Sequence, residues 1–161
     1  MKTTNMIVQA KLSFDSSLNV VDKAFAIESS RILADNPIGF AFYARLQRQG
    51  TDILFINDPT MVEMGFFYAP RNLLTVNMLY HSSAQEVVST MVHEATHQNG
   101  FFRGLPYQHT QFSEYQAFRN ELFFENGKRP SLETRFNLWN NIQEKLYPHL
   151  PQGKYPFGDR K

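Results

Sequence analysis

The chain has 161 residues, enough for one domain with a sizeable hydrophobic core. Its hydrophobic content of 42% and aromatic content of 14% argue against disorder, and its formal charge of +1 provides no global attraction to nucleic acid or to an anionic membrane. Cysteine is absent, which excludes disulfides, thiol catalysis and cysteine-ligated zinc but is compatible with either a reducing or an oxidising compartment.

The first fifty residues predict a strand or a tail, followed by two helices. Residues 1–15 alternate loosely between apolar and polar types, which fits either a strand or a tail. The serine pair at 16–17 offers an N-cap for a first helix that ends near Asn36. Pro37 suits the first turn of a second helix, and Gly50 suits its end, although the dense aromatic residues between them also permit a strand.

Three strands are predicted next, over residues 52–57, 65–68 and 72–77, and the last two are joined by residues 69–71. The strand at 72–77 leads toward the helix discussed below. We expect it to be either an exposed edge strand that can pair with an extended peptide, or a buried strand of the core.

The next element carries the most specific motif of the chain, His93-Glu94-Ala95-Thr96-His97. Histidines four residues apart share one face of a helix, so both rings can reach one ion, and Glu94 can contact a water bound to that ion. A capping box at 83–86, an apolar series and a stop signal at 99–100 support a helix. We therefore predict a metal-binding helix; the alternative is two ordinary surface histidines on a core helix.

Two more helices are predicted in the C-terminal part. Thr110 can cap a helix that runs to about Glu125, and residues 130–131 can open a last helix that runs to Leu146. An irregular tail follows over 148–161. Together the elements predict a single α+β domain over 1–161, in which a short mixed sheet or hairpin packs on the active-site helix and its flanking helices.

A catalytic zinc ion needs three protein ligands and one position left open for water. The extended pattern H-E-x-x-H-x-x-G-x-x-H is excluded, because Arg103 stands at the position of its third histidine and a guanidinium does not ligate. Glu114 is favoured, because it opens the next helix and the small Ala117 lets that helix approach the metal helix closely. The other candidates are His109, Glu121 and Glu125. The last two could instead orient a metal-bound histidine.

The predicted chemistry follows from this ligand set. Two neutral imidazoles and one carboxylate leave a zinc site with net charge +1, which acidifies a bound water and polarises a carbonyl group. Glu94 is then the general base, which takes the proton of the water and passes it to the leaving amine. The oxyanion needs a further donor, for which spacing leaves five candidates: Arg103, Tyr107, His109, Tyr115 and His149.

In this order of elements, the chain resembles the zincin metallopeptidases, in their small glutamate-ligand branch (minimal gluzincins). The resemblance covers roughly residues 50–146 and rests on H-E-x-x-H and on the segment Ser113-Glu-Tyr-Gln-Ala117. It implies Zn²⁺ (zinc) as cofactor, His93, His97 and Glu114 as ligands, Glu94 as base, and an edge-strand hairpin over 68–77. The Glu114 segment departs from the thermolysin-type N-E-x-x-S-D pattern, so the substrates of that group do not transfer.

The chain is also similar to small metallopeptidase domains of bacterial polymorphic toxins and type VI secretion effectors. This resemblance implies a peptide, protein or peptidoglycan-peptide substrate, a cognate immunity protein, and delivery by a specialised secretion system into a target-cell periplasm or cytoplasm. No apolar run long enough for a membrane span and no signal-peptide core are present in the sequence. Two alternatives are an intracellular regulatory zinc protease and a non-catalytic binding domain on a zincin scaffold.

Overall fold

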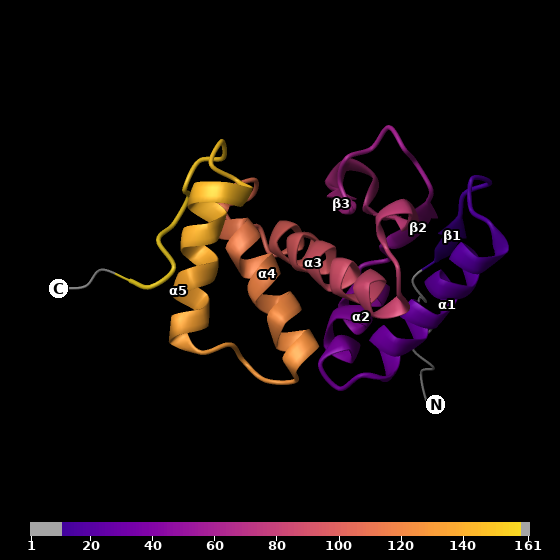
Figure 1. Cartoon of the computed structure of the whole chain (residues 1–161), viewed down its shortest axis with the longest axis horizontal. Helices are drawn as coiled ribbons and strands as arrows, with labels where there is room; N and C mark the ends of the chain where they lie inside the picture. The colour runs from indigo at the N-terminus through magenta and orange to yellow at the C-terminus, as the bar shows by residue number, and fades with distance from the viewer. Residues whose placement is uncertain (1–10, 159–161) are drawn as a thin grey trace, which may run out of the picture.

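The computed structural model describes residues 11–158. Over this range the fold is α+β, as predicted, with five α-helices and a four-stranded mixed sheet. Helices α4 and α5 lie at one end of the molecule, the sheet and helices α1 and α2 lie at the other, and α3 runs between them (Figure 1). The motif helix therefore connects the two ends.

The sheet confirms the predicted strands and decides between the two alternatives for the strand at 72–77 in favour of a buried strand. Its strands are β1 (Leu12–Phe14), β2 (Asp52–Ile56), β3 (Gly65–Tyr68) and β4 (Leu73–Asn77). They lie in the order β1-β2-β4-β3, with β3 antiparallel to β4 and the other pairs parallel. The edge strand on the motif-helix side is therefore β3, whereas β4 is internal and almost fully buried because it pairs on both sides.

Helices α1 (Val20–Asp35) and α2 (Gly39–Arg48) follow the predicted order. The N-cap of α1 is Asn19, whose side chain accepts a hydrogen bond from the backbone of Asp22, and not the serine pair at 16–17. Ser17 instead accepts from the backbone N–H of Asn57, which ties the start of the chain to the end of β2. The cap prediction was wrong because a long-range contact engages the serine.

Helix α3 (Ala84–Phe102) contains the motif and is two residues longer than its stop signal predicts. The backbone turns at Gly104, where φ is +64°, and not at Gly100. Gly100 is a helix residue that allows a close contact, because a Cβ there would lie 2.7 Å from the side-chain amide of Gln108. The loop after α3 is therefore folded back against the helix.

Helices α4 (Gln111–Asn126) and α5 (Leu132–Asn141) confirm the predicted capping residues. Thr110 and Ser131 accept hydrogen bonds from the first turns, and Gly127 closes α4 with φ +69°. A wider π-helical turn over Ile142–Leu146 extends α5. None of the helices in the described range has the length and apolarity needed to cross a bilayer.

The tail has no helix or strand over residues 148–158, as predicted for this part, yet it is packed against the helices. The carbonyl groups of Pro151 and Gln152 accept hydrogen bonds from the first-turn amides of α4. The ring of Phe157 stacks on Phe136 of α5 with centroids 4.1 Å apart. These contacts hold the preceding segment, 147–150, against the start of α4.

Two apolar clusters lie on either side of the motif. The larger one joins the sheet with α1, α2 and α3 through side chains such as Phe55, Leu74 and Met91. The smaller one joins α4, α5 and the tail around Tyr115, Trp139 and Ile142. Because α3 and α4 pack closely together between these clusters, polar side chains at their junction are held in fixed positions.

Candidate metal centre and cleft

Three predicted ligands converge at the junction of α3 and α4. His93 and His97 come from α3, one turn apart, and Glu114 comes from the first turn of α4. The Nε2 atom of His93 lies 3.1 Å from one carboxylate oxygen of Glu114, and the Nε2 atom of His97 lies 3.4 Å from the other. The ligand atoms of all three residues lie within 4.8 Å of one another, so they surround a single point.

A second carboxylate fixes one of the rings. The Nδ1 atom of His93 makes a short hydrogen bond with Glu121, and Phe118 packs edge-on against the same ring at 4.7 Å. With Nδ1 as the donor to Glu121, Nε2 of His93 faces the cluster, where it is hydrogen-bonded to Glu114; once Nε2 gives up its proton, its lone pair can ligate a metal ion. Glu125, the other glutamate predicted to orient a metal-bound histidine, accepts a hydrogen bond from Ser89 instead.

The electrostatics of the cluster fit a bound cation. Burial would lower the pKa of His93, but its hydrogen bonds to Glu114 and Glu121 and the charge of Glu94 outweigh burial and raise the pKa to about 10. Burial also opposes ionisation of Glu114, yet the hydrogen bonds from both histidines lower its pKa. The carboxylates therefore require a positive charge among them. Two imidazole nitrogens and one carboxylate are a donor set that suits Zn²⁺.

Glu94 occupies a different position from the other carboxylates. Its side chain is 6% exposed, and it accepts no hydrogen bond from the residues of the described range. Burial raises the pKa of this carboxyl, against the opposing influence of the two histidines. A buried carboxylate without a protein donor, next to a site for a metal ion, is suited to take up a proton from a molecule in the cleft.

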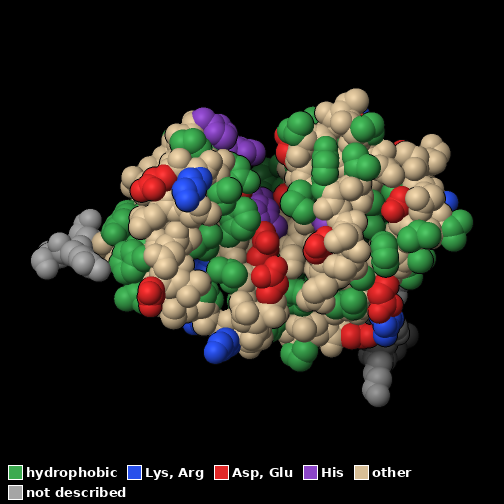
Figure 2. All heavy atoms as spheres, viewed as in Figure 1, with side chains coloured by type: hydrophobic (Ala, Val, Ile, Leu, Met, Phe, Trp, Pro, Cys, Tyr) green, Lys and Arg blue, Asp and Glu red, His purple; other side chains and the backbone are tan. Residues whose placement is uncertain are grey.

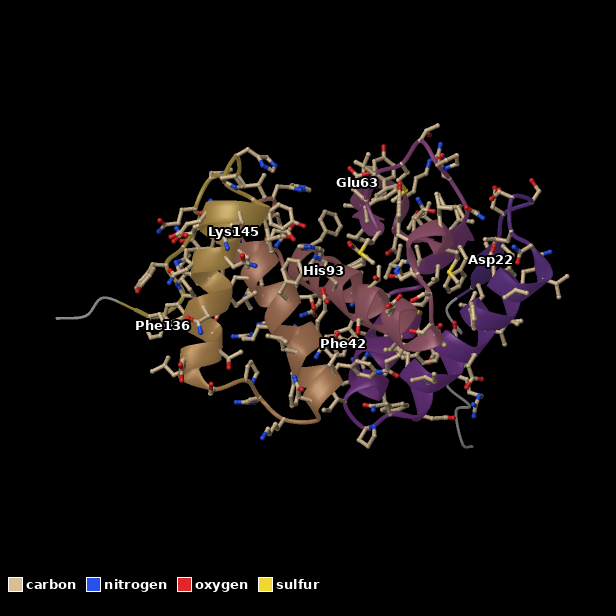
Figure 3. All side chains as sticks on the ribbon, in the orientation of Figure 1. Asp22, Phe42, Glu63, His93, Phe136 and Lys145 are labelled. Atoms are coloured by element: carbon tan, nitrogen blue, oxygen red, sulfur yellow. The ribbon has the colours of Figure 1, made fainter. Side chains whose placement is uncertain are left out.

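The cluster lies where two cavities meet. Figure 2 shows the hollow between the two ends of the molecule, with acidic and histidine side chains gathered in it. The first cavity, of about 660 Å³, lies between α3, α4 and the loop before β3, and the second, of about 440 Å³, lies between β3 and the segments around His109 and His149. His93 and Glu94 line both. In Figure 3, His93 lies between the loop that carries Glu63 and the end of the molecule that carries Lys145.

Of the five oxyanion candidates, His109 and His149 line the second cavity. Arg103, Tyr107 and Tyr115 are not among the lining residues of either cavity. Arg103 follows the extended end of α3, about 9 Å beyond His97 along the helix axis, and Tyr107 packs its ring on Phe112. Tyr115 is 2% exposed, because the residue after Glu114 points about 100° further round α4, toward Trp139.

Tyr147 is a residue of the site that sequence analysis missed. It lines both cavities, and burial together with the nearby carboxylates of Glu114 and Glu94 raises the pKa of its phenol. The hydroxyl therefore remains protonated at neutral pH and can donate a hydrogen bond. No local motif marks this tyrosine, since it reaches the site only because the π-helical turn and the packed tail hold it there.

The fold and the site together define a class: a small α+β domain with a partly buried cluster of two histidines and one glutamate, beside a buried glutamate that accepts no hydrogen bond within residues 11–158. Comparisons with known protein families, curated proteins and solved structures found no match. The function is therefore argued from the geometry and chemistry of this site.

Proposed function

We propose that the chain is a zinc-dependent metallopeptidase of the zincin type. The observation that carries this proposal is the convergence of His93, His97 and Glu114 on one point, with Glu94 buried and unpaired beside it. A Zn²⁺ ion held by these three side chains would supply Lewis acidity, which acidifies a water molecule and polarises a peptide carbonyl group.

The side chains of the chain have separate roles in this proposal. Glu94 takes the proton of the attacking water and delivers it to the amine that leaves. The hydroxyl of Tyr147 donates a hydrogen bond to the carbonyl oxygen as negative charge develops there. His109 and His149 line the same cavity as further hydrogen-bond donors. Glu121 keeps the ring of His93 in its ligating orientation.

The position of β3 supports a peptide as the substrate. This strand is the edge of the sheet, and Gly65, Phe66 and Phe67 from it line the second cavity together with His93 and Glu94. An unpaired strand edge offers backbone donors and acceptors to an extended peptide. A peptide paired with β3 would run past the metal cluster.

Zinc content and hydrolysis of a mixed peptide library test the proposal. We expect about one zinc ion per chain, loss of tight zinc binding in Glu114→Ala, and a zinc-loaded but inactive Glu94→Gln variant, with turnover reduced on the order of 100- to 10,000-fold. Absence of zinc after reconstitution at neutral pH, tight zinc in Glu114→Ala, or full activity of Glu94→Gln would overturn it. A silent Glu94→Gln variant would favour the non-catalytic binding domain.

We further propose that this peptidase acts as an antibacterial effector, with a cognate immunity protein as its partner; the resemblance to toxin and effector domains supports this. Expression of the chain in the cytoplasm and in the periplasm of bacteria, with Glu94→Gln as control, tests it. Toxicity that depends on Glu94 is the expected result. Unchanged growth in both compartments would count against an effector and favour a regulatory protease.

A further inference from the structure

The first cavity has an unbalanced charge. Among residues 11–158, its lining includes neither lysine nor arginine but has five glutamates: Glu63, Glu86, Glu94, Glu121 and Glu125. Only one histidine, His93, accompanies them. Carboxylates that share a concave surface repel one another, and the low-dielectric walls strengthen this repulsion, so the cavity favours a cation from outside the chain.

The hydrogen bonds of the chain leave much of this charge uncompensated. Glu121 is engaged by His93, while Glu94, buried and facing the cavity, accepts no hydrogen bond within the described range. Glu125 and Glu86 each keep one carboxylate oxygen without a hydrogen bond from the described residues. Glu125 accepts a hydrogen bond only from the hydroxyl of Ser89, at 2.8 Å, and Glu86 accepts hydrogen bonds from Ser82 on one oxygen. In residues 11–158, none of the five forms an ion pair with a lysine or an arginine.

The loop before β3 adds exposed apolar surface to the same cavity. Val62 is 82% exposed and Met64 is 47% exposed, and both lie in the loop before β3 that borders the cavity. Phe118 and Tyr147 add aromatic surface on the other side. An apolar wall beside carboxylates matches a side chain with an alkyl stem and a cationic head, because lysine and arginine bury their stems on apolar surface.

The carboxylate of Glu125 lies at about the length of a long side chain from the proposed base. The hydrogen bond between Ser89 and Glu125 places that carboxylate beside a residue five positions before Glu94 on α3. At a rise of about 1.5 Å per residue, the separation along the helix axis is roughly 7–8 Å. A cationic head at Glu125 therefore belongs to a residue whose backbone is near the metal cluster.

We propose that this cavity binds a lysine or arginine side chain of the substrate, close to the peptide bond that is hydrolysed. The inference rests on the proposed function for the bond-breaking step, but the binding preference itself requires no catalysis. The ligand chemistry is a cation on a flexible apolar stem. A neutral side chain of the same length would fill the space and leave the carboxylates uncompensated.

Binding to the Glu94→Gln chain, which cannot complete the reaction, tests the inference. The probes are matched peptides from the mixed library that differ at one position only: lysine, arginine, citrulline or norleucine. We expect lysine and arginine peptides to bind about tenfold tighter than the neutral ones. The advantage should fall below about threefold when Glu63→Gln and Glu125→Gln are added, and should persist when Glu144→Gln, an exposed substitution outside the cleft, is added instead.

Equal binding of the charged and neutral peptides, or an advantage that persists without the carboxylates of Glu63 and Glu125, would overturn the inference. Glu63 is exposed and has no hydrogen bond to another residue of the described range, so Glu63→Gln alone provides a folded variant in which a smaller loss of preference is still required. Hydrolysis by the wild-type chain is measured separately. Tighter binding of lysine and arginine peptides without hydrolysis would contradict the proposed function only. Hydrolysis without tighter binding of these peptides would contradict this inference only.

Discussion

Tyr147 shows how much of the site depends on one side chain from the end of the fold. Its phenol lies beside Glu114 and lines both cavities, so it is placed to meet the oxygen of a carbonyl group held at the cluster. A neutral donor fixed in a buried position stabilises developing negative charge without reorganisation during the reaction.

We predict that Tyr147→Phe lowers kcat about 100-fold and leaves zinc content and KM nearly unchanged, because the hydroxyl contributes mainly when the oxyanion forms. Steady-state kinetics and metal analysis measure both effects. Tyr155→Phe is the matched control, since that ring lies in the tail and packs on Trp139 outside the cleft. An unchanged kcat in Tyr147→Phe would assign the oxyanion to His109 or His149 instead.

Sequence reasoning succeeded at the residue scale where the relation between residues is local. The proximity of His93 and His97 follows from helical geometry, and Glu114 lies near them because it opens the next helix; their roles as ligands stay a prediction. Tyr147 could not be found in this way. Its position depends on the π-helical turn after α5 and on the hydrogen bonds between the tail and α4, which no local pattern encodes.

At the scale of elements, the contact between β3 and α3 brings the sheet edge to the proposed base. Gly65 is the closest point of this contact. A Cβ at this residue would lie 2.7 Å from Thr90 Cγ2, 2.9 Å from the carbonyl oxygen of Thr75 and 3.2 Å from Glu94 Cγ. Only a residue without a side chain permits this spacing, since one of the three neighbours is backbone.

Gly65→Ala should therefore separate β3 from α3 and displace Glu94. We expect a loss of about 1–3 kcal/mol in the free energy of unfolding and a lower kcat/KM at temperatures where the variant is folded. Denaturant unfolding and peptide hydrolysis measure the two effects. Gly127→Ala is the control: its Cβ would meet open space, so its positive φ costs about 1–2 kcal/mol without change at the site. Equal kcat/KM in both variants would contradict the proposed contact.

The elements themselves were predicted well, but their arrangement and some of their ends were not. Caps such as Ser83 and Thr110 act within four residues, so the local sequence is sufficient. The order β1-β2-β4-β3 depends on long-range pairing, and the pattern of β4 fitted an edge or a core strand equally. Gly100 resembles a helix stop, but a glycine is needed there because the side chain of Gln108, in the following loop, packs against it.

At the scale of the whole molecule, the α+β class followed from the sequence of predicted strands and helices, and the structure confirms it. The position of the cleft did not follow. It lies between the two apolar clusters, where α3 passes from the sheet end to the α4–α5 end of the molecule. Which cluster each aromatic residue joins is decided by packing, so composition alone could not locate the hollow between them.

The net charge of +1 conceals a strong separation of charge. The first cavity gathers carboxylates, whereas a cavity between α2, α3 and α4 is lined by Arg45, Arg103 and Arg119 and, in the part of the chain that the structure describes, by no acidic residue. A molecule with one acidic and one basic cavity attracts a cationic partner to the acidic cavity before contact, and dissolved salt weakens that attraction.

We therefore expect the association rate constant of a basic peptide to fall several-fold as ionic strength rises from about 0.01 M to about 1 M, over which the Debye length shrinks from about 30 Å to about 3 Å. The matched norleucine peptide should change little, and the dissociation rate of both should vary less than the association rate. Stopped-flow mixing with the Glu94→Gln chain measures these rates. If both peptides respond equally to salt, the acidic cavity does not guide the encounter. If they differ, the chain begins to discriminate between peptides while the two molecules are still diffusing toward each other.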